Sequence, residues 1–146
     1  MMAAAKEGSA PICRILLSAH ADAHLKNKDG WTALHVSART GDVELFNLLR
    51  NQAPETLTIR ATNGRSILNT LALHGHSRIL SQLLDGDTSL VEFAHANFVL
   101  QDAASSNDSF MIKSLRPFFA SCDWLEKDGS GLSPLHAASQ VSHLHV

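Results

Sequence analysis

The chain has 146 residues, of which 45% are hydrophobic, and a formal net charge of −2 at pH 7 with histidine neutral, values typical of a soluble globular domain. Only 5% of the residues are aromatic and no basic run occurs, which argues against the clustered cations and stacking surfaces of nucleic-acid binding. No segment has the roughly 18 apolar residues of a membrane span, and the N-terminus lacks a secretory signal. We therefore expect no nucleic-acid or membrane partner and an intracellular protein, in the cytoplasm with the nucleus also open.

The first residues follow the pattern of a helix end and a second helix. Residues 3–8 are rich in alanine and finish at Gly8, and apolar residues, among them Cys13 and Leu16, then recur at helical spacing. No turn or capping residue precedes this helix, so we expect an incomplete first repeat. Cys13 and Cys122 lie in different repeats and should both be thiols in a reducing compartment.

The clearest local pattern follows the turn dipeptide Asp29-Gly30. Thr32 stands where a helix N-cap is expected, because its hydroxyl can accept a hydrogen bond from an amide of the first helical turn. Gly41 favours a helix end, since glycine adopts the left-handed backbone of a C-terminal stop, and Asp42 can cap a second helix from residue 43 to about residue 50. The pattern predicts two short antiparallel helices.

This two-helix pattern recurs along the chain, and its two clearest copies are 34 residues apart. The recurring positions are Gly30, Ala38 and Gly41, which return as Gly64, Ala72 and Gly75. The helix start Thr32-Ala-Leu-His35 returns as Ser66-Ile-Leu-Asn69 and again as Ser133-Pro-Leu-His136, whereas the copy between them, Phe98-Val-Leu-Gln101, is eroded. A helix pair cannot bury its apolar face alone, so we expect the pairs to stack on one another.

The connections between the helix pairs are less regular. Pro54 and Pro117 should end the helices that precede them. Residues 56–63 are expected to form a loop, and residues 90–98 an irregular connection. Residues 118–124 are unusually aromatic and either fill the eroded fourth repeat or contact a partner; the aromatic residues are Phe118, Phe119 and Trp124.

The helix starts and the period together resemble the ankyrin repeat family, whose signature is a Thr-Pro-Leu-His helix start in a period of about 33 residues. The resemblance implies an all-α solenoid of stacked helix-turn-helix units with short protruding finger turns, about four repeats plus a partial fifth. It implies a single domain over residues 1–146. The repeats are expected at residues 1–28 (partial), 29–61, 62–94, 95–127 (degenerate) and 128–146 (truncated). Because the first and last are incomplete, the sequence is expected to belong to a longer array.

The residues that could carry chemistry have structural explanations. We interpret Thr32, His35, Ser66, Ser133 and His136 as capping residues, in which each imidazole bonds to the capping hydroxyl and to the adjacent finger backbone. The pairs His74-Gly-His76 and His143-Leu-His145 have no further ligands at zinc spacing. No nucleophile elbow and no phosphate-binding loop occurs. The sequence therefore predicts no metal site, no cofactor and no enzymatic activity.

The resemblance implies a protein partner of unknown identity, bound by the finger tips and the concave face of the first helices. Trp31 is the strongest candidate, because tryptophan is enriched at energetic hot spots of interfaces; the alternative is that Trp31 packs against the neighbouring finger. We expect the protein to act as a monomer. The predicted partner-binding residues are Lys28, Asp29, Trp31, Arg39, Thr40, Thr62, Asn63, Arg65, Leu73 and His74.

Two further hypotheses come from the fingers. Residues 26–31 and 73–76 also resemble repeats of an ankyrin protein that assists an aminoacyl-tRNA synthetase, which would make this chain an accessory protein with reactive finger lysines such as Lys28. Separately, Leu16, Asp22, Ala23 and His24 resemble the spacing hydroxylated in some ankyrin fingers, with His24 in the target position.

Overall fold

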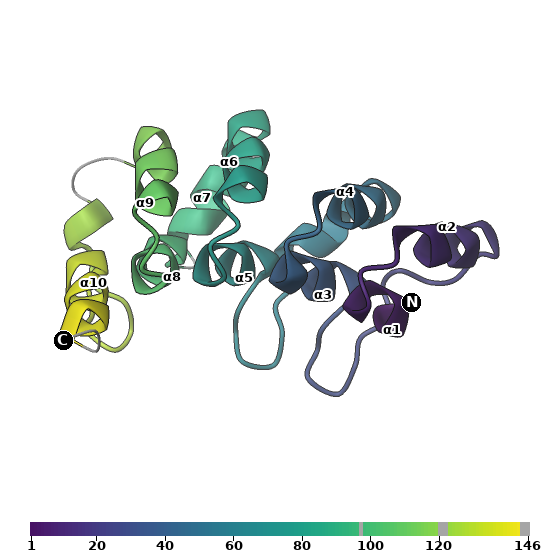
Figure 1. The fold of residues 1–146 in the computed structure, drawn as a ribbon. Coiled ribbons are helices and arrows are strands. Elements are labelled where there is room, and N and C mark those ends of the chain that lie inside the picture. Colours follow the sequence, from purple (N-terminus) through teal and green to yellow (C-terminus); the bar gives the residue numbers. More distant parts are fainter. Residues whose placement is uncertain (97, 120–122, 144–146) are drawn as a thin grey trace. The chain divides into compact units, whose positions relative to one another are not determined.

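A computed structural model describes residues 1–96, 98–119 and 123–143. Within these ranges the regular elements are helices (Figure 1). The sole β-type pairing among the described residues is an isolated bridge between Arg60 and Ser66. The predicted all-α class is confirmed. The chain divides into two compact units, Met1–Thr70 and Leu71–Val146, which we call unit 1 and unit 2. The single domain over residues 1–146 stays a prediction.

Unit 1 contains two stacked helix pairs. The first helices, α1 and α3, pack against each other, and the second helices, α2 and α4, do the same behind them. A short 3-10 helix, η1, packs on α4, and helix α5 (Ile67–Leu73) contains the boundary between the units. The elements are α1 (Met2–Lys6), α2 (Ala10–Ser18), α3 (Ala33–Thr40), α4 (Val43–Gln52) and η1 (Pro54–Thr58).

The core of unit 1 lies between these four helices. Phe46 and Leu45 are fully buried on α4, and Leu34 is buried on the facing side of α3. Cys13 is buried on α2 as a free thiol, and burial raises the pKa of that thiol. Buried apolar side chains on each helix therefore hold the two pairs together.

Local capping fixes where α3 and α4 begin and end. Thr32 and His35 form a reciprocal capping box at the start of α3. Gly41 ends this helix in the left-handed conformation, with φ of 76°, and the carboxylate of Asp42 then accepts a hydrogen bond of 3.0 Å from the Leu45 amide. Gly41 and Asp42 therefore determine the turn between the two helices, because glycine adopts the left-handed backbone conformation at little cost and aspartate caps the next helix.

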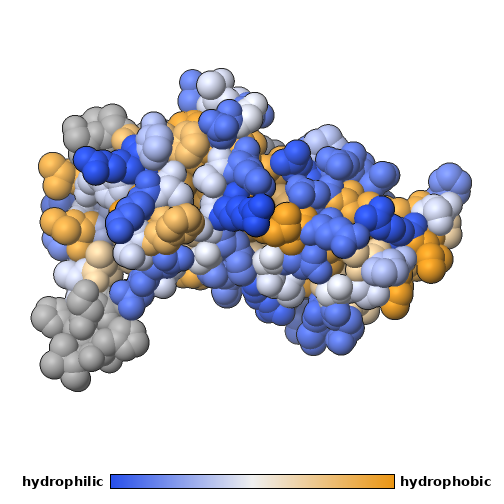
Figure 2. All heavy atoms as spheres, turned by 45° about the horizontal axis from the view of Figure 1, so that its top comes forward, coloured by the Kyte–Doolittle hydropathy of each residue, from blue (hydrophilic) through white to orange (hydrophobic). Residues whose placement is uncertain are grey.

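The outer side of α2 is apolar and exposed. Ile12 and Ile15 keep 51% and 67% of their surface accessible. Figure 2 shows hydrophobic surface near the N-terminal end of unit 1, at the right of the view. α2 thus buries one side against α4 and leaves a second apolar side uncovered within its own unit.

The described part of unit 2 also consists of packed helices, and α7 is inserted between the helices α6 and α8. Helix α8 packs on α10, α9 packs on α6 and α8, and α7 lies against both α6 and α8. Its buried side chains include Leu80, Met111 and Leu115. The elements are α6 (Ser77–Gly86), α7 (Thr88–Ala96), α8 (Val99–Ser105), α9 (Ser109–Leu115), η2 (Arg116–Phe118), η3 (Asp123–Leu125) and α10 (Pro134–His143).

Two segments differ from the sequence prediction. Residues 56–63 were expected to form a loop, but the 3-10 helix η1 continues to Thr58, because Pro54 starts it with a suitable φ and the Thr56 hydroxyl donates to the Ala53 carbonyl at 2.7 Å. The irregular connection expected at residues 90–98 is largely the helix α7. Asp87 caps that helix by accepting a 2.8 Å hydrogen bond from the Ser89 amide.

The two prolines act as the sequence indicates. Helix α4 ends at Gln52, before Pro54, and α9 ends at Leu115, where Pro117 continues the chain as the 3-10 helix η2. None of the described helices has both the length and the apolar composition needed to cross a bilayer.

Candidate binding site

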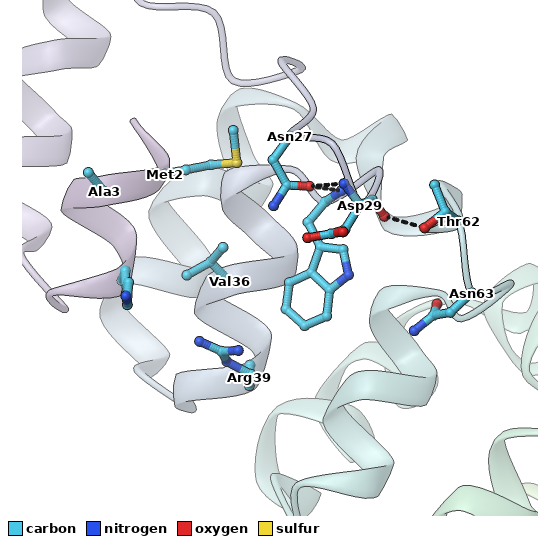
Figure 3. A pocket seen from close by; sticks show the side chains of 10 residues that line it. Met2, Ala3, Asn27, Asp29, Val36, Arg39, Thr62 and Asn63 are labelled. Atoms are coloured by element: carbon cyan, nitrogen blue, oxygen red, sulfur yellow. Dashed lines mark hydrogen bonds between the residues drawn. The ribbon is translucent and has the colours of Figure 1, made fainter.

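Unit 1 contains a hollow of about 570 Å³ on the side of its first helices. Helix α1, helix α3 and the two fingers that follow α2 and η1 surround it (Figure 3). We call residues 19–32 the first finger and residues 59–66 the second finger. The lining residues are Met2, Ala3, Lys6, Asn27, Asp29, Trp31, Val36, Arg39, Thr62 and Asn63.

Hydrogen bonds hold the first finger in shape. The side-chain oxygen of Asn27 accepts from the backbone amides of Asp29 and Trp31, each at 2.9 Å. The backbone carbonyl of Asp29 accepts from both the amide and the hydroxyl of Thr62, each at 3.0 Å. The two fingers are therefore joined, and the wall of the hollow is formed before any partner arrives.

Gly30 permits the close approach of the fingers. Its φ is 75°, and a Cβ atom at this position would lie 3.0 Å from the Thr62 amide nitrogen and 3.2 Å from the Ala61 Cα. A larger residue would be strained by its backbone angle and by this contact. The turn glycine thus fixes the distance between the two fingers.

Trp31 is partly buried at the edge of the hollow. Its ring is tilted against the His35 ring, with 5.9 Å between the ring centroids. The guanidinium carbon of Arg39 lies 5.5 Å from the Trp31 ring centroid, a cation–π contact. The indole is therefore held by α3 of its own repeat while part of its surface stays accessible.

The hollow brings together half of the predicted partner-binding residues. Asp29, Trp31, Arg39, Thr62 and Asn63 line it. The other predicted residues of unit 1 are exposed but do not line it; they are Lys28, Thr40 and Arg65. In unit 2, Leu73 is half-buried and His74 is exposed, with its ring stacked at 6.4 Å from that of His76.

Sequence reasoning missed several residues of the hollow. Lys6 was assigned to an incomplete first repeat, although Ala5-Lys-Glu-Gly8 matches Ala38-Arg-Thr-Gly41 and so places Lys6 in register with Arg39. That register was the signal that could have found it. The sequence did not indicate a role for Asn27, because its side chain acts only by accepting hydrogen bonds from backbone amides within the turn. The remaining missed residues are Met2, Ala3 and Val36.

His35 lies behind Trp31 and has a structural environment. The Thr32 amide donates to the His35 Nδ1 at 3.2 Å, so Nδ1 is unprotonated and the Thr32 hydroxyl, at 3.0 Å, donates to it as well. Nε2 is buried and forms no hydrogen bond of standard geometry with a described residue. Burial lowers the pKa of His35 to about 4; the backbone of Ile59 opposes this shift and Lys26 adds to it.

The equivalent positions in later repeats carry related contacts. The Ser66 amide donates to the Asn69 side-chain oxygen at 3.1 Å, and the Ser133 amide donates to the His136 Nδ1 at 3.3 Å. In the eroded copy, the Gln101 amide group instead donates to the Glu126 carbonyl at 3.2 Å. These side chains brace helix starts and loops.

His24 on the first finger lies between two carboxylates. Its Nδ1 is 2.9 Å from the Asp22 Oδ1, and its Nε2 contacts the Glu55 carboxylate of η1. The side-chain hydrogen bonds to Glu55 and Asp22 raise the pKa of His24 above 6.5. The pKa values of both carboxyl groups are lowered by their bonds to His24. The predicted hydroxylation of His24 stays a prediction.

We expect His24 to titrate above pH 6.5 in the folded chain. Because its folded pKa is raised, the stabilisation it contributes is complete below pH 6.5 and is lost as the pH rises through the folded pKa. An NMR titration of the imidazole carbons measures this pKa, and Glu55→Gln should move it back toward 6.5. Equal pKa values in the two proteins would show that the contact with Glu55 does not form in solution.

The remaining candidate residues are potential metal ligands and aromatic side chains. Among the described residues, no group of three or more His, Cys, Asp or Glu side chains could hold a metal ion. In unit 2, Phe119 is buried, and Trp124 lines a separate apolar hollow of about 250 Å³ beside α10. Cys122 and the pair His143 and His145 fall outside the residues whose side chains are described.

Capped helix pairs joined by short fingers define a helical-repeat protein. The chain matches the family described as ankyrin repeats in three copies over residues 1–94, and it belongs to the ankyrin repeat family. This family is a non-enzymatic interaction fold whose members generally bind protein partners.

Two curated relatives share the repeats. The chain is 34% identical over 92 residues to ankyrin repeat and SAM domain-containing protein 6 of Rattus norvegicus, covering 62% of this chain and 9% of that protein. It is 29% identical over 142 residues to the probable E3 ubiquitin-protein ligase XBOS32 of Oryza sativa subsp. japonica, covering 97% of this chain and 28% of that protein. The chain thus spans less than a third of the length of either relative.

Proposed function

We propose that this chain is a non-catalytic module that binds a protein partner through the hollow of unit 1, as a monomer inside the cell, in the cytoplasm with the nucleus also open. The observation that carries the proposal is the placement of Trp31 and Arg39 in a hollow whose finger wall is already formed. A preformed site loses less conformational entropy on binding than a flexible one. Trp and Arg are also the residue types that most often dominate binding energy.

The hollow has the right dimensions and composition for a segment of a protein. Its volume lies within the range of sites that hold several side chains or a small ligand. Apolar surface from Met2, Val36 and Trp31 adjoins polar groups of Asn27, Thr62 and Asn63. Such a site can bury a hydrophobic side chain and hydrogen-bond to the backbone that carries it.

Replacing Trp31 by alanine should weaken partner binding by about tenfold or more, because a half-buried indole that lines the hollow supplies a large contact area. The measurement is fluorescence anisotropy with peptides selected from a phage-displayed random library on the immobilised wild-type chain. Circular dichroism of Trp31→Ala shows whether its helices are intact.

The matched control is Asn47→Ala, which removes an exposed side chain of α4 that does not line the hollow. It should bind the selected peptides as the wild type does. If Trp31→Ala and the wild type bind every selected peptide equally, the hollow is not the binding surface.

The hypothesis of an accessory protein for an aminoacyl-tRNA synthetase gains no support from these findings. Lys28 is exposed on the first finger but does not line the hollow. The names of the two relatives mention no synthetase.

A further inference from the structure

We propose that the hollow of unit 1 binds the main chain of an extended partner segment. The side-chain amides of Asn27 and Asn63 donate to carbonyl groups of that segment, and one of its hydrophobic side chains packs on Trp31. This inference rests on the proposed function and adds the way in which the partner is recognised. The recognition requires no charged side chain in the partner.

The first argument is the orientation of the Asn27 side chain. Its Oδ1 accepts hydrogen bonds from the backbone amides of Asp29 and Trp31, each at 2.9 Å. Because both of these groups are N–H donors, the atom they approach is the oxygen, and the Nδ2 group is the other end of the amide. Figure 3 shows this nitrogen on the side away from the hydrogen-bonded turn. It donates to none of the described residues, so its N–H groups are open to a ligand in the hollow.

Asn63 has the same arrangement in the second finger. Its Oδ1 accepts from the Arg65 amide at 3.0 Å, which again leaves the Nδ2 group as the open end of the side chain. Asn63 also lines the hollow. Each of the two fingers therefore offers a side-chain donor whose position is fixed by a hydrogen bond to the backbone of that finger.

Hydrogen bonds connect the two donors into one polar edge of the hollow. We call this edge the finger rim; it consists of Asn27, Asp29, Thr62 and Asn63 (Figure 3). The Asn27 side chain is bonded to the Asp29 amide, and the Asp29 carbonyl accepts from the Thr62 hydroxyl at 3.0 Å. The Asp29 carboxylate adds an acceptor between the two amide donors. The finger rim thus offers both donors and acceptors.

A main chain complements the finger rim, because every residue other than proline carries one N–H donor and one carbonyl acceptor. A helix uses these groups for its own hydrogen bonds, so the bound segment must be extended, with its residues repeating about every 3.3 Å. A carboxylate offers only acceptors and a lysine ammonium only donors, so either one matches half of the rim. The observations therefore favour a main chain over a charged side chain.

The hydrophobic contact is coupled to the finger rim. The Trp31 amide is one of the two that bond to Asn27, so one turn positions both the indole and the Asn27 donor. The indole is half-buried against the His35 ring, and it lines the hollow together with Met2. A hydrophobic side chain packed on Trp31 would place the main chain that carries it beside the rim.

The variants Asn27→Asp and Asn63→Asp test the two donors. Aspartate keeps the oxygen that accepts from the finger amides but lacks the NH₂ group, so the turn should stay intact. Each variant should bind the peptides selected from the phage-displayed library about fivefold more weakly than the wild type, because a carbonyl of the peptide loses its donor. A salt concentration of about 0.5 M screens the added negative charge.

The matched control is Asn47→Asp, the same change at an exposed position of α4 that does not line the hollow. It should leave the affinity within about twofold of the wild type. Circular dichroism of all three variants shows whether their helices are intact.

Replacing single peptide bonds of a selected peptide by esters tests the partner's side of the same contact. An ester has no N–H group, and its carbonyl is a weaker acceptor than that of an amide. At least one ester next to the hydrophobic residue should weaken binding to the wild type by about fivefold. The same ester should have a smaller effect on binding to Asn27→Asp or to Asn63→Asp, because the two changes remove the same hydrogen bond.

The outcomes separate this inference from the proposed function. Peptides that depend on Trp31 but bind Asn27→Asp and Asn63→Asp as tightly as Asn47→Asp would overturn main-chain recognition and leave the proposed function standing. Peptides that depend on Trp31 but tolerate an ester at every position would do the same. A library that yields no peptide dependent on Trp31 would count against the proposed function itself.

Discussion

Replacing Phe46 by alanine is expected to destabilise unit 1 by about 3–5 kcal/mol, the largest effect of any single substitution considered for this chain. Phe46 is fully buried on α4, the helix that packs against α2, α3 and η1. Removing the ring loses the free energy gained by burying its apolar surface. It also leaves a cavity, which the surrounding helices cannot fully fill because their other contacts hold them in place. The loss reaches the hollow, because α4 supports α3, which carries Val36 and Arg39.

Urea unfolding followed by circular dichroism measures this effect. Asn47→Ala is the control on the same helix, where an exposed side chain is removed and the change should stay within about 0.5 kcal/mol. Phe46→Leu keeps most of the apolar volume and should lower the free energy of unfolding by about 1 kcal/mol. This variant still measures the contribution of Phe46 to stability if Phe46→Ala does not fold. A loss below 1 kcal/mol for Phe46→Ala would mean that α4 does not pack as described.

The second large effect is a pH dependence that originates at His35. Burial holds its pKa at about 4 in the folded chain, against 6.5 for an exposed imidazole. Between these values the unfolded chain binds a proton that the folded chain does not bind. Stability is therefore complete above pH 6.5 and falls as the pH decreases toward 4, by about 3 kcal/mol in total. Protonation of Nδ1 would also remove the acceptor for the Thr32 amide.

The chain itself suggests the matched variant, His35→Asn. Asn69 holds the same position in the next repeat, where its side-chain oxygen accepts from the Ser66 amide at 3.1 Å and from the Ser66 hydroxyl at 2.7 Å. An asparagine at position 35 can keep these bonds but cannot titrate. The variant should be less stable at neutral pH, since the smaller side chain leaves space, yet lose less stability on acidification.

Urea unfolding at neutral pH and at about pH 5 compares the two proteins. All other titrating groups are shared, so the difference between their pH profiles reports His35. Equal losses in the wild type and in His35→Asn would show that His35 is not held neutral by burial.

Much of the fold follows from local signals in the sequence. Thr32, Gly41 and Asp42 each have a side-chain or backbone preference strong enough to mark the ends of helices α3 and α4. The 34-residue period extends this pattern to α5 and α6. Helix α7 was not expected because residues 88–96 match no repeat position, although they contain neither glycine nor proline and follow the capping residue Asp87.

The hollow was harder to predict because it depends on packing between repeats. Trp31 and Arg39 could be placed near a binding surface by register, but their contact with each other is a result of the helix geometry. Asn27 contributes through hydrogen bonds to amides two and four residues later. The link between Asp29 and Thr62 joins residues one repeat apart. Such contacts leave no pattern within a single repeat.

The most direct test of the binding surface is an NMR titration of the ¹⁵N-labelled chain with a peptide selected from the library. If the partner binds in the hollow, the shifted amides should cluster in the first finger around Asn27 and Trp31, in the last turns of α1 and α3 beside Lys6 and Arg39, and at Thr62. Shifts confined to α2, α4 or unit 2, with these amides unchanged, would contradict binding in the hollow.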